Sequence, residues 1–141
     1  MAYEYKQHQA DVGIRITADT IEHAFIDGAK AMFGVMVEIE GVENKQKVHI
    51  DCTGTDIPSL FVNFLNELLS QKDIEDMFFS DFRIDKLEEK EGMFYLEATA
   101  SGERIAIGRH EIRTEVKAAT FHGIRYENTD EGIMLQCVLD V

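Results

Sequence analysis

The sequence lacks tryptophan and has only one proline and two cysteines in 141 residues. So little proline, with ten glycines, excludes a long disordered linker of the usual composition. Cys52 and Cys137 are far apart and have no metal-ligand spacing, so neither a zinc motif nor a disulfide is indicated. The chain also lacks an apolar signal core after Met1 and any run of about 18 apolar residues. We therefore expect a cytoplasmic protein with no membrane span.

Cationic side chains are also scarce, with 14 Lys and Arg against 27 Asp and Glu, a formal net charge of −13. Nucleic-acid-binding proteins gain affinity by placing Lys and Arg against phosphates. Direct tight binding to RNA or DNA, or to an anionic membrane surface, is therefore not expected. A basic protein partner or a divalent cation fits this charge, although the charge alone would also keep a small domain in solution.

The hydrophobic pattern predicts two amphipathic helices. The first follows Asp19 or Thr20, and its apolar stripe from Ile21 to Met36 includes small residues that permit close packing against a sheet. The second follows Asp56, with Pro58 in its first turn, where a missing N–H costs nothing.

The remaining segments alternate between polar and apolar residues, as strands do. Strands are predicted at 3–8, 14–17, 47–52, 77–87, 93–100, 111–120, around 124–126, and 132–140. Short turns between the late strands favour antiparallel pairing. We therefore expect a single α+β domain over residues 1–141, with two helices packed on a mixed, largely antiparallel sheet.

No strong enzymatic signature is present. The chain has no P-loop, no Gly-x-Ser-x-Gly elbow and no zinc spacing among its five histidines. Asp11 lies at a strand junction, as either a turn residue or a functional carboxylate. The chain stops after an apolar strand, with Asp140 and the α-carboxylate of Val141 close together. Ca²⁺ or Mg²⁺ would relieve carboxylate repulsion there, but whether Asp11 reaches Asp140 depends on the fold.

Lys117 is the cation in an otherwise uncharged stretch. One interpretation is a lysine whose stem lies along a strand edge while its ammonium stays in water. The other is a functional cation near the acidic cluster, able to contact a phosphate or a partner's carboxylate.

Five short segments, in order along essentially the whole chain, resemble the archease family. The first is His8-Gln9-Ala10-Asp11-Val12-Gly13, which resembles the family's His-Thr-Ala-Asp-Val-Gly. The second, from Ala24-Phe25 to Val35-Met36, resembles its alanine-rich first helix. The third is Phe64-Leu65-Asn66-Glu67-Leu68-Leu69, similar to Trp-Leu-Asn-Glu-Leu-Leu. The last two are Val116-Lys117-Ala118-Ala119-Thr120-Phe121-His122-Gly123 and the ending Val138-Leu139-Asp140-Val141.

The resemblance implies a partner and a site. Archeases assist the RtcB-type RNA ligase that joins RNA ends in tRNA splicing and repair. They promote its guanylylation, permit many turnovers and widen its nucleotide use beyond GTP. By similarity, Asp11, Asp140 and Val141 would bind a divalent cation, with Ca²⁺ expected and Mg²⁺ the alternative. The residues expected to contact the partner or a nucleotide are Lys117, His8 and His122.

The chain departs from the family pattern at two positions. Phe64 replaces a Trp within an apolar stripe, whereas Gln9 replaces a Thr two residues before Asp11 and so bears on the affinity of the site. Two other functions remain open: a stand-alone metal-dependent phosphohydrolase, and a chaperone-like module for RNA-processing proteins. The first needs an acid–base pair that the sequence does not supply. The second needs a large exposed apolar patch. An accessory protein that is not itself an enzyme is therefore the leading hypothesis.

Overall fold

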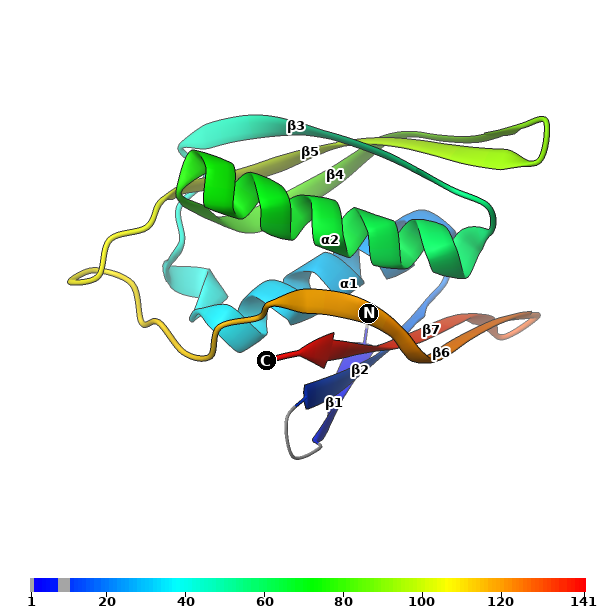
Figure 1. Ribbon diagram of the computed structural model, residues 1–141, viewed down its shortest axis with the longest axis horizontal. Coiled ribbons are helices and arrows are strands. Elements are labelled where there is room, and N and C mark those ends of the chain that lie inside the picture. Colours follow the sequence, from blue (N-terminus) through cyan, green and yellow to red (C-terminus); the bar gives the residue numbers. More distant parts are fainter. Residues whose placement is uncertain (1, 8–10) are drawn as a thin grey trace.

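The computed structural model describes residues 2–7 and 11–141, and in it two helices lie between two sheets (Figure 1). The four-stranded sheet has the order β1 (Ala2–Gln7), β2 (Asp11–Ala18), β7 (Gly132–Asp140) and β6 (Ala118–Thr129). The three-stranded sheet has the order β3 (Gln46–Gly54), β5 (Met93–Arg104) and β4 (Met77–Lys90). All pairings between these strands are antiparallel. The α+β class is thus confirmed, with the strands divided between two sheets.

Both helices begin where the capping residues predicted. The Thr20 side chain accepts a hydrogen bond from the His23 N–H at 3.1 Å, and α1 (Ile21–Met36) follows it. The Asp56 side chain accepts one from the Ser59 N–H at 2.8 Å at the start of α2 (Ile57–Glu75). Each cap satisfies one of the N–H groups that a helix leaves unpaired at its first turn. A short 3₁₀ turn, η1 (Ile39–Gly41), follows α1. No helix in the described part of the chain is long and apolar enough to cross a membrane.

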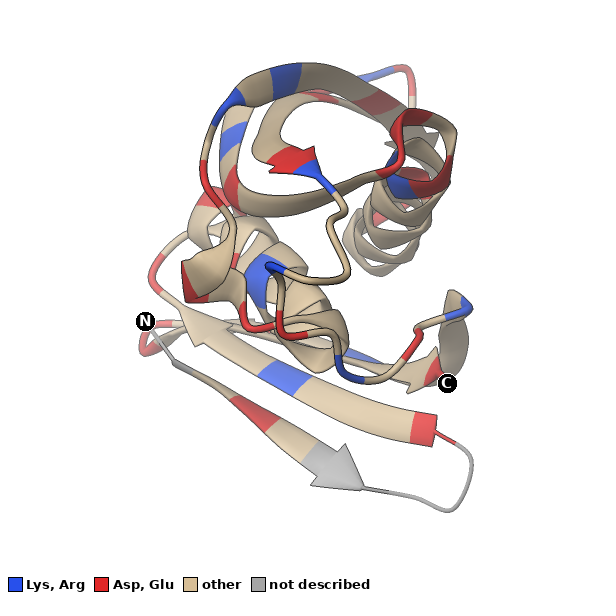
Figure 2. Cartoon of the chain, turned by 90° about the vertical axis from the view of Figure 1, so that its left-hand side faces the viewer, with Lys and Arg blue, Asp and Glu red and all other residues tan. Residues whose placement is uncertain are grey.

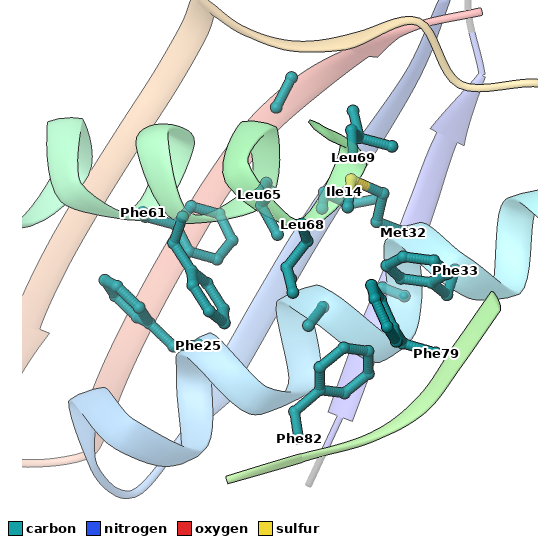
Figure 3. Close-up of a cluster of buried hydrophobic side chains, with 14 of the residues drawn as sticks. Ile14, Phe25, Met32, Phe33, Phe61, Leu65, Leu68, Leu69, Phe79 and Phe82 are labelled. Atoms are coloured by element: carbon teal, nitrogen blue, oxygen red, sulfur yellow. The ribbon is translucent and has the colours of Figure 1, made fainter. Parts of the chain in front are cut away.

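The core is centred on the contact between the two helices (Figure 3). Phe25 of α1 meets Phe61 of α2 edge to face, with ring centroids 5.2 Å apart, and stacks on Phe64 at 5.7 Å. Gly28 permits this approach, because a Cβ there would lie 2.4 Å from the Phe61 ring. The small residues of α1 were predicted to allow close packing against a sheet, but at Gly28 the close neighbour is the other helix.

Strand alternation places the last strand as predicted. Within β7, Ile133, Leu135, Cys137 and Leu139 are all buried. Cys137 and Cys52 are both free thiols. Asp140, next in the alternation, therefore belongs to the opposite face of the sheet, which neither helix covers (Figure 1).

The predicted strand at 111–120 is wrong over its first seven residues, because β6 begins only at Ala118. The Arg113 and Thr114 N–H groups donate to the carbonyls of Met36 and Val35, at 2.7 and 3.1 Å. A helix leaves its last carbonyls unpaired, so this segment caps the C-terminus of α1 instead of joining a sheet. The alternation of the segment indicated an extended backbone correctly but indicated the wrong hydrogen-bond partner.

The connection between β5 and β6 is anchored by a buried ionic cluster around Glu103. Glu103 and His110 are each 5% exposed. His110 Nδ1 accepts from the Ala106 N–H at 3.0 Å, so its proton is on Nε2, which donates to the Glu103 carboxylate at 3.1 Å. The Glu43 N–H donates to the same carboxylate at 2.7 Å, and the Arg109 guanidinium also bonds to it. The connection is therefore fixed at its base.

A second buried acid, Asp27 of α1, has no such support. It is 1% exposed, and neither carboxylate oxygen has a hydrogen-bond partner in the described structure. Burial raises the pKa of this carboxyl, and the nearby Lys30 charge opposes that rise only in part. A buried carboxylate without donors opposes folding, so Asp27 costs the protein stability at neutral pH.

We predict that Gly28→Ala destabilises the protein by up to about 2 kcal/mol. Alanine should gain about 1 kcal/mol in helix propensity, but the added methyl collides with the packed Phe61 ring, and overpacking costs about 1–3 kcal/mol. Urea unfolding measures the difference. Gly41→Ala is the control, because a Cβ at Gly41 meets nothing within 4 Å. Equal stability of the two variants would contradict the close contact.

We predict that Glu103→Gln costs about 1.5–3 kcal/mol at pH 7, the range for hydrogen bonds to a charged group. Burial alone would raise the pKa of Glu103. The Glu43 N–H, the His110 hydrogen bond and the Arg109 and Lys45 charges outweigh burial and lower the pKa from 4.5 to about 2. The lowered pKa contributes stability above pH 4.5, and this is lost as pH falls toward 2.

The measurement is urea unfolding across that pH window. The free energy of unfolding should fall less steeply with acid in Glu103→Gln than in the wild type. Glu97→Gln, at an exposed position of the same strand, is the control and should follow the wild type. Parallel curves for all three proteins would refute the role assigned to Glu103.

We also predict that Asp27→Asn raises the free energy of unfolding at neutral pH by about 1–2 kcal/mol, because it removes a buried charge at nearly constant volume. The gain should shrink as pH is lowered, since the wild-type carboxyl then becomes neutral. Thermal unfolding at several pH values checks both points. Asp73→Asn, on the exposed surface of α2, is the matched control. A loss of stability in Asp27→Asn would show that the Asp27 carboxylate makes a stabilising interaction and would contradict the prediction.

Candidate functional site

The pairing of β2 with β7 brings two predicted site residues together. Asp11 at the start of β2 and Asp140 at the end of β7 are directly opposite Cα partners. The next pair, Val12 and Leu139, turns inward, so the two aspartates share the face opposite the core. Cβ atoms of such cross-strand partners lie about 4.5–5.5 Å apart. The sequence alone could not establish this proximity, which follows from the strand register.

Val141, the third residue predicted to bind a cation, lies at the same end of the sheet. Val141 directly follows Asp140 and is partly buried, and Figure 2 shows the C-terminus beside the start of β2. Asp140 is exposed and Asp11 partly buried. The three residues predicted to bind a cation, Asp11, Asp140 and Val141, thus lie at one end of the two central strands. We call this end of the sheet the carboxylate edge.

Lys117 approaches the same place from the third strand. Its backbone N–H donates to the Asp140 carbonyl at 2.8 Å, and the next residue, Ala118, is the β6 partner of Asp140. The Lys117 side chain is exposed. The structure therefore places the backbone of Lys117 next to that of Asp140, at the junction where the anchored 105–117 connection enters the sheet.

Of the two histidines predicted to contact a partner or nucleotide, the structure describes only one. His8 lies outside the described residues. His122 is exposed in the middle of β6, where the register with β7 shifts between Thr120 and Arg125 and Gly123 has a φ of +64°. His122 is thus farther along the strand than the residue opposite Asp140. Its predicted role in contacting a partner or nucleotide stays a prediction.

Asn66 is a positioning residue that the sequence indicated only as part of a motif. Its side chain bonds to both backbone groups of Ala119: Nδ2 donates to the carbonyl at 2.9 Å, and Oδ1 accepts from the N–H at 2.8 Å. Asn66 belongs to α2, so this pair of bonds fastens the start of β6, and with it Lys117, to the helix. A polar amide within the apolar stripe was the signal that could have identified it.

The donor set of this edge fits a hard divalent cation. Carboxylate oxygens are the ligands that Ca²⁺ and Mg²⁺ prefer, and Ca²⁺ takes six to eight of them. Two aspartates and the terminal carboxylate supply only part of such a shell, which leaves positions for water or phosphate oxygens. Among the side chains that the structure describes, no group of three His, Cys, Asp or Glu is arranged to hold a metal.

Comparison with known proteins gives a consistent result. Residues 3–141 match the archease protein family. The chain is 41% identical over 140 residues to the protein archease of Pyrococcus furiosus, covering 99% of this chain and 98% of the relative. It is 34% identical over 141 residues to that of Methanopyrus kandleri, covering the whole of both chains.

Solved structures agree. The solution structure of Methanobacterium thermoautotrophicum protein 1598 superposes with a TM-score of 0.83 at 34% identity, covering 99% of this chain and 98% of the other. The crystal structure of a Thermotoga maritima archease, described as a possible chaperone, gives a TM-score of 0.61, covering 96% of this chain and 94% of that one. At 12% identity it supports the fold alone. The family match, the full-length relatives and the shared fold together show that this chain belongs to the archease family.

Proposed function

We propose that this protein activates an RtcB-type RNA ligase, promoting its guanylylation and repeated turnover in tRNA splicing and widening its nucleotide use. The observation that carries the proposal is the direct pairing of Asp11 with Asp140, with Val141 and Lys117 at the same strand ends. These are the residues that the family resemblance implies for function. In this role the protein is a cofactor for another enzyme, not an enzyme itself.

The charge distribution supports action on a protein rather than on RNA. With a net charge of −13, the chain is repelled from a polyanion, whereas the nucleotide- and RNA-handling cleft of a ligase must be basic. We therefore place the acidic sheet edge against that cleft. The two free cysteines are compatible with a reducing cytoplasm, where we expect the protein to act.

Within the proposed complex, the residues of the edge have separate tasks. Asp11, Asp140 and the terminal carboxylate would hold the cation, preferably Ca²⁺, with Mg²⁺ as the alternative. When bound, such a cation supplies positive charge to phosphate oxygens of the nucleotide or the ligase site. Lys117 would add a flexible ammonium at the same edge. The Asn66 bonds to Ala119 hold the neighbouring backbone in place.

The decisive test is multiple-turnover RNA joining by the cognate ligase with and without this protein. Wild type should stimulate joining, and Asp11→Asn and Asp140→Asn should each lower the stimulated rate roughly tenfold or more, since even loss of a group that hydrogen-bonds to a metal ligand costs about 10–100-fold. Asp130→Asn, in the β6–β7 turn at the other end of β7, is the matched control and should stimulate normally. Calorimetric titration with Ca²⁺ and Mg²⁺ should show binding that both site variants lose.

Two outcomes would redirect the proposal. Stimulation that survives both substitutions would separate the activator role from the carboxylate edge. Hydrolysis of a nucleotide or phosphodiester by the protein alone, lost in Asp11→Asn, would support the stand-alone phosphohydrolase instead. All variants must first show wild-type unfolding transitions, so that lost activity is not lost structure.

A further inference from the structure

The β5–β6 connection carries an aliphatic side chain at its most exposed point. Ile107 is 86% exposed, in a segment that projects from the body of the protein (Figure 1). Loop tips are usually polar and mobile. Here the Arg109 and His110 N–H groups both donate to the Ala106 carbonyl, at 3.1 and 2.9 Å, which closes a tight turn around Ile107. The buried Glu103 cluster fixes the base of that turn, so the backbone that carries Ile107 is held in place.

A hollow of about 320 Å³ lies beside Ile107. Its apolar lining consists of Met36, Phe78, Ile105, Ile107 and Ile112. Ile112 is 46% exposed, so the apolar surface continues out of the hollow along the connection. Isolated exposed aliphatic residues are common, but several around one concavity are typical of a binding surface.

The hollow leads toward the carboxylate edge. Arg113 and Thr114 form one of its walls and also line a second hollow of about 350 Å³. The second hollow includes Val12, the neighbour of Asp11. Both hollows thus adjoin the short segment that caps α1; one includes Val12 of β2, on the helix-covered face of the sheet, and the other includes Ile107.

The charges at the first hollow are predominantly negative. Two cations, Lys72 and Arg113, are accompanied by four carboxylates, those of Asp73, Glu38, Glu111 and Glu115. Arg113 bonds to two of them, with Glu38 at 2.7 Å and Glu111 at 3.0 Å. Of these, Lys72, Arg113 and Glu115 line the hollow itself, and each cation has a carboxylate partner, so the rim of the apolar hollow is acidic on balance.

We propose that this surface, formed by Ile105, Ile107 and Ile112, docks an extended basic segment of the partner protein. The segment would place one or two large apolar side chains in the hollow and Lys or Arg against the rim. A nucleic acid fits neither the apolar lining nor the rim, and a second copy of this acidic chain would be repelled. The identity of the partner as the RNA ligase rests on the proposed function.

Docking and activation thus use different parts of the protein surface. The carboxylate edge acts on the ligase's nucleotide site and sets the maximal stimulation. The surface around Ile107 supplies affinity, because a rigid apolar side chain loses little conformational freedom on binding. A change at Ile107 should therefore alter the half-maximal concentration, and a change at the carboxylate edge should alter the maximal rate.

The experiment measures stimulated ligation, and calorimetric binding to the ligase, across a range of concentrations of this protein. Ile107→Glu should raise the half-maximal concentration and the dissociation constant by about tenfold or more, while the maximal rate is restored at saturation. Asp140→Asn should lower the maximal rate with the half-maximal concentration changed by less than about threefold. Tyr95→Glu adds the same charge at a 42%-exposed position of β5, in the three-stranded sheet, and should match the wild type.

Ile107 is nearly fully exposed, so its substitution should leave the unfolding transition unchanged. Glu115→Lys, which reverses a rim charge, should also weaken binding. If the wild type binds and stimulates and Ile107→Glu does both equally well, the docking surface is wrong and the activator function stands. If the wild type neither binds nor stimulates the ligase, the proposed function fails and the docking inference fails with it.

Discussion

The contact between Gly28 and the Phe61 ring determines how closely the two helices approach, and both sheets are built on those helices. The α2 helix also fastens β6 through Asn66, while the C-terminus of α1 receives the segment that precedes β6. Lys117 is held directly to Asp140 by its N–H, and these two attachments set where the paired strand ends lie relative to the helices. A change in the helix pair would reach the carboxylate edge through these two attachments.

The sequence predicted those parts of the fold that local rules decide. The caps at Thr20 and Asp56 and the alternation of β7 all gave correct elements. The segment 111–117 was predicted as a strand because alternation reports an extended backbone and not its partner, which here is the end of a helix. The pairing of Asp11 with Asp140 is also non-local, since it depends on the register of strands from opposite ends of the chain. The resemblance identified the residues, but only the fold could bring them together.

Carboxylates serve two opposite purposes in this protein. Glu103 is buried, receives donors from several directions, and its lowered pKa keeps it charged and its connection rigid. Asp140 is exposed at a strand end, where its charge remains available to a ligand. Glu103 uses its hydrogen-bonding capacity inside the protein, whereas Asp140 is the kind of carboxylate that the proposed cation site requires. An acidic composition alone cannot distinguish them, because the difference is in the donors around each group.

The two bonds between Asn66 and Ala119 have a consequence for association with other chains. An edge strand normally exposes unpaired N–H and C=O groups that can add a strand from another molecule. At Ala119 both groups are already taken by a side chain that imitates the next strand. Beyond it, the irregular register around Gly123 interrupts the regular spacing that an added strand requires. At Ala119, close to Asp140, the backbone of β6 is thus blocked for strand addition, so a partner that binds at this point has to contact side chains instead of extending the sheet.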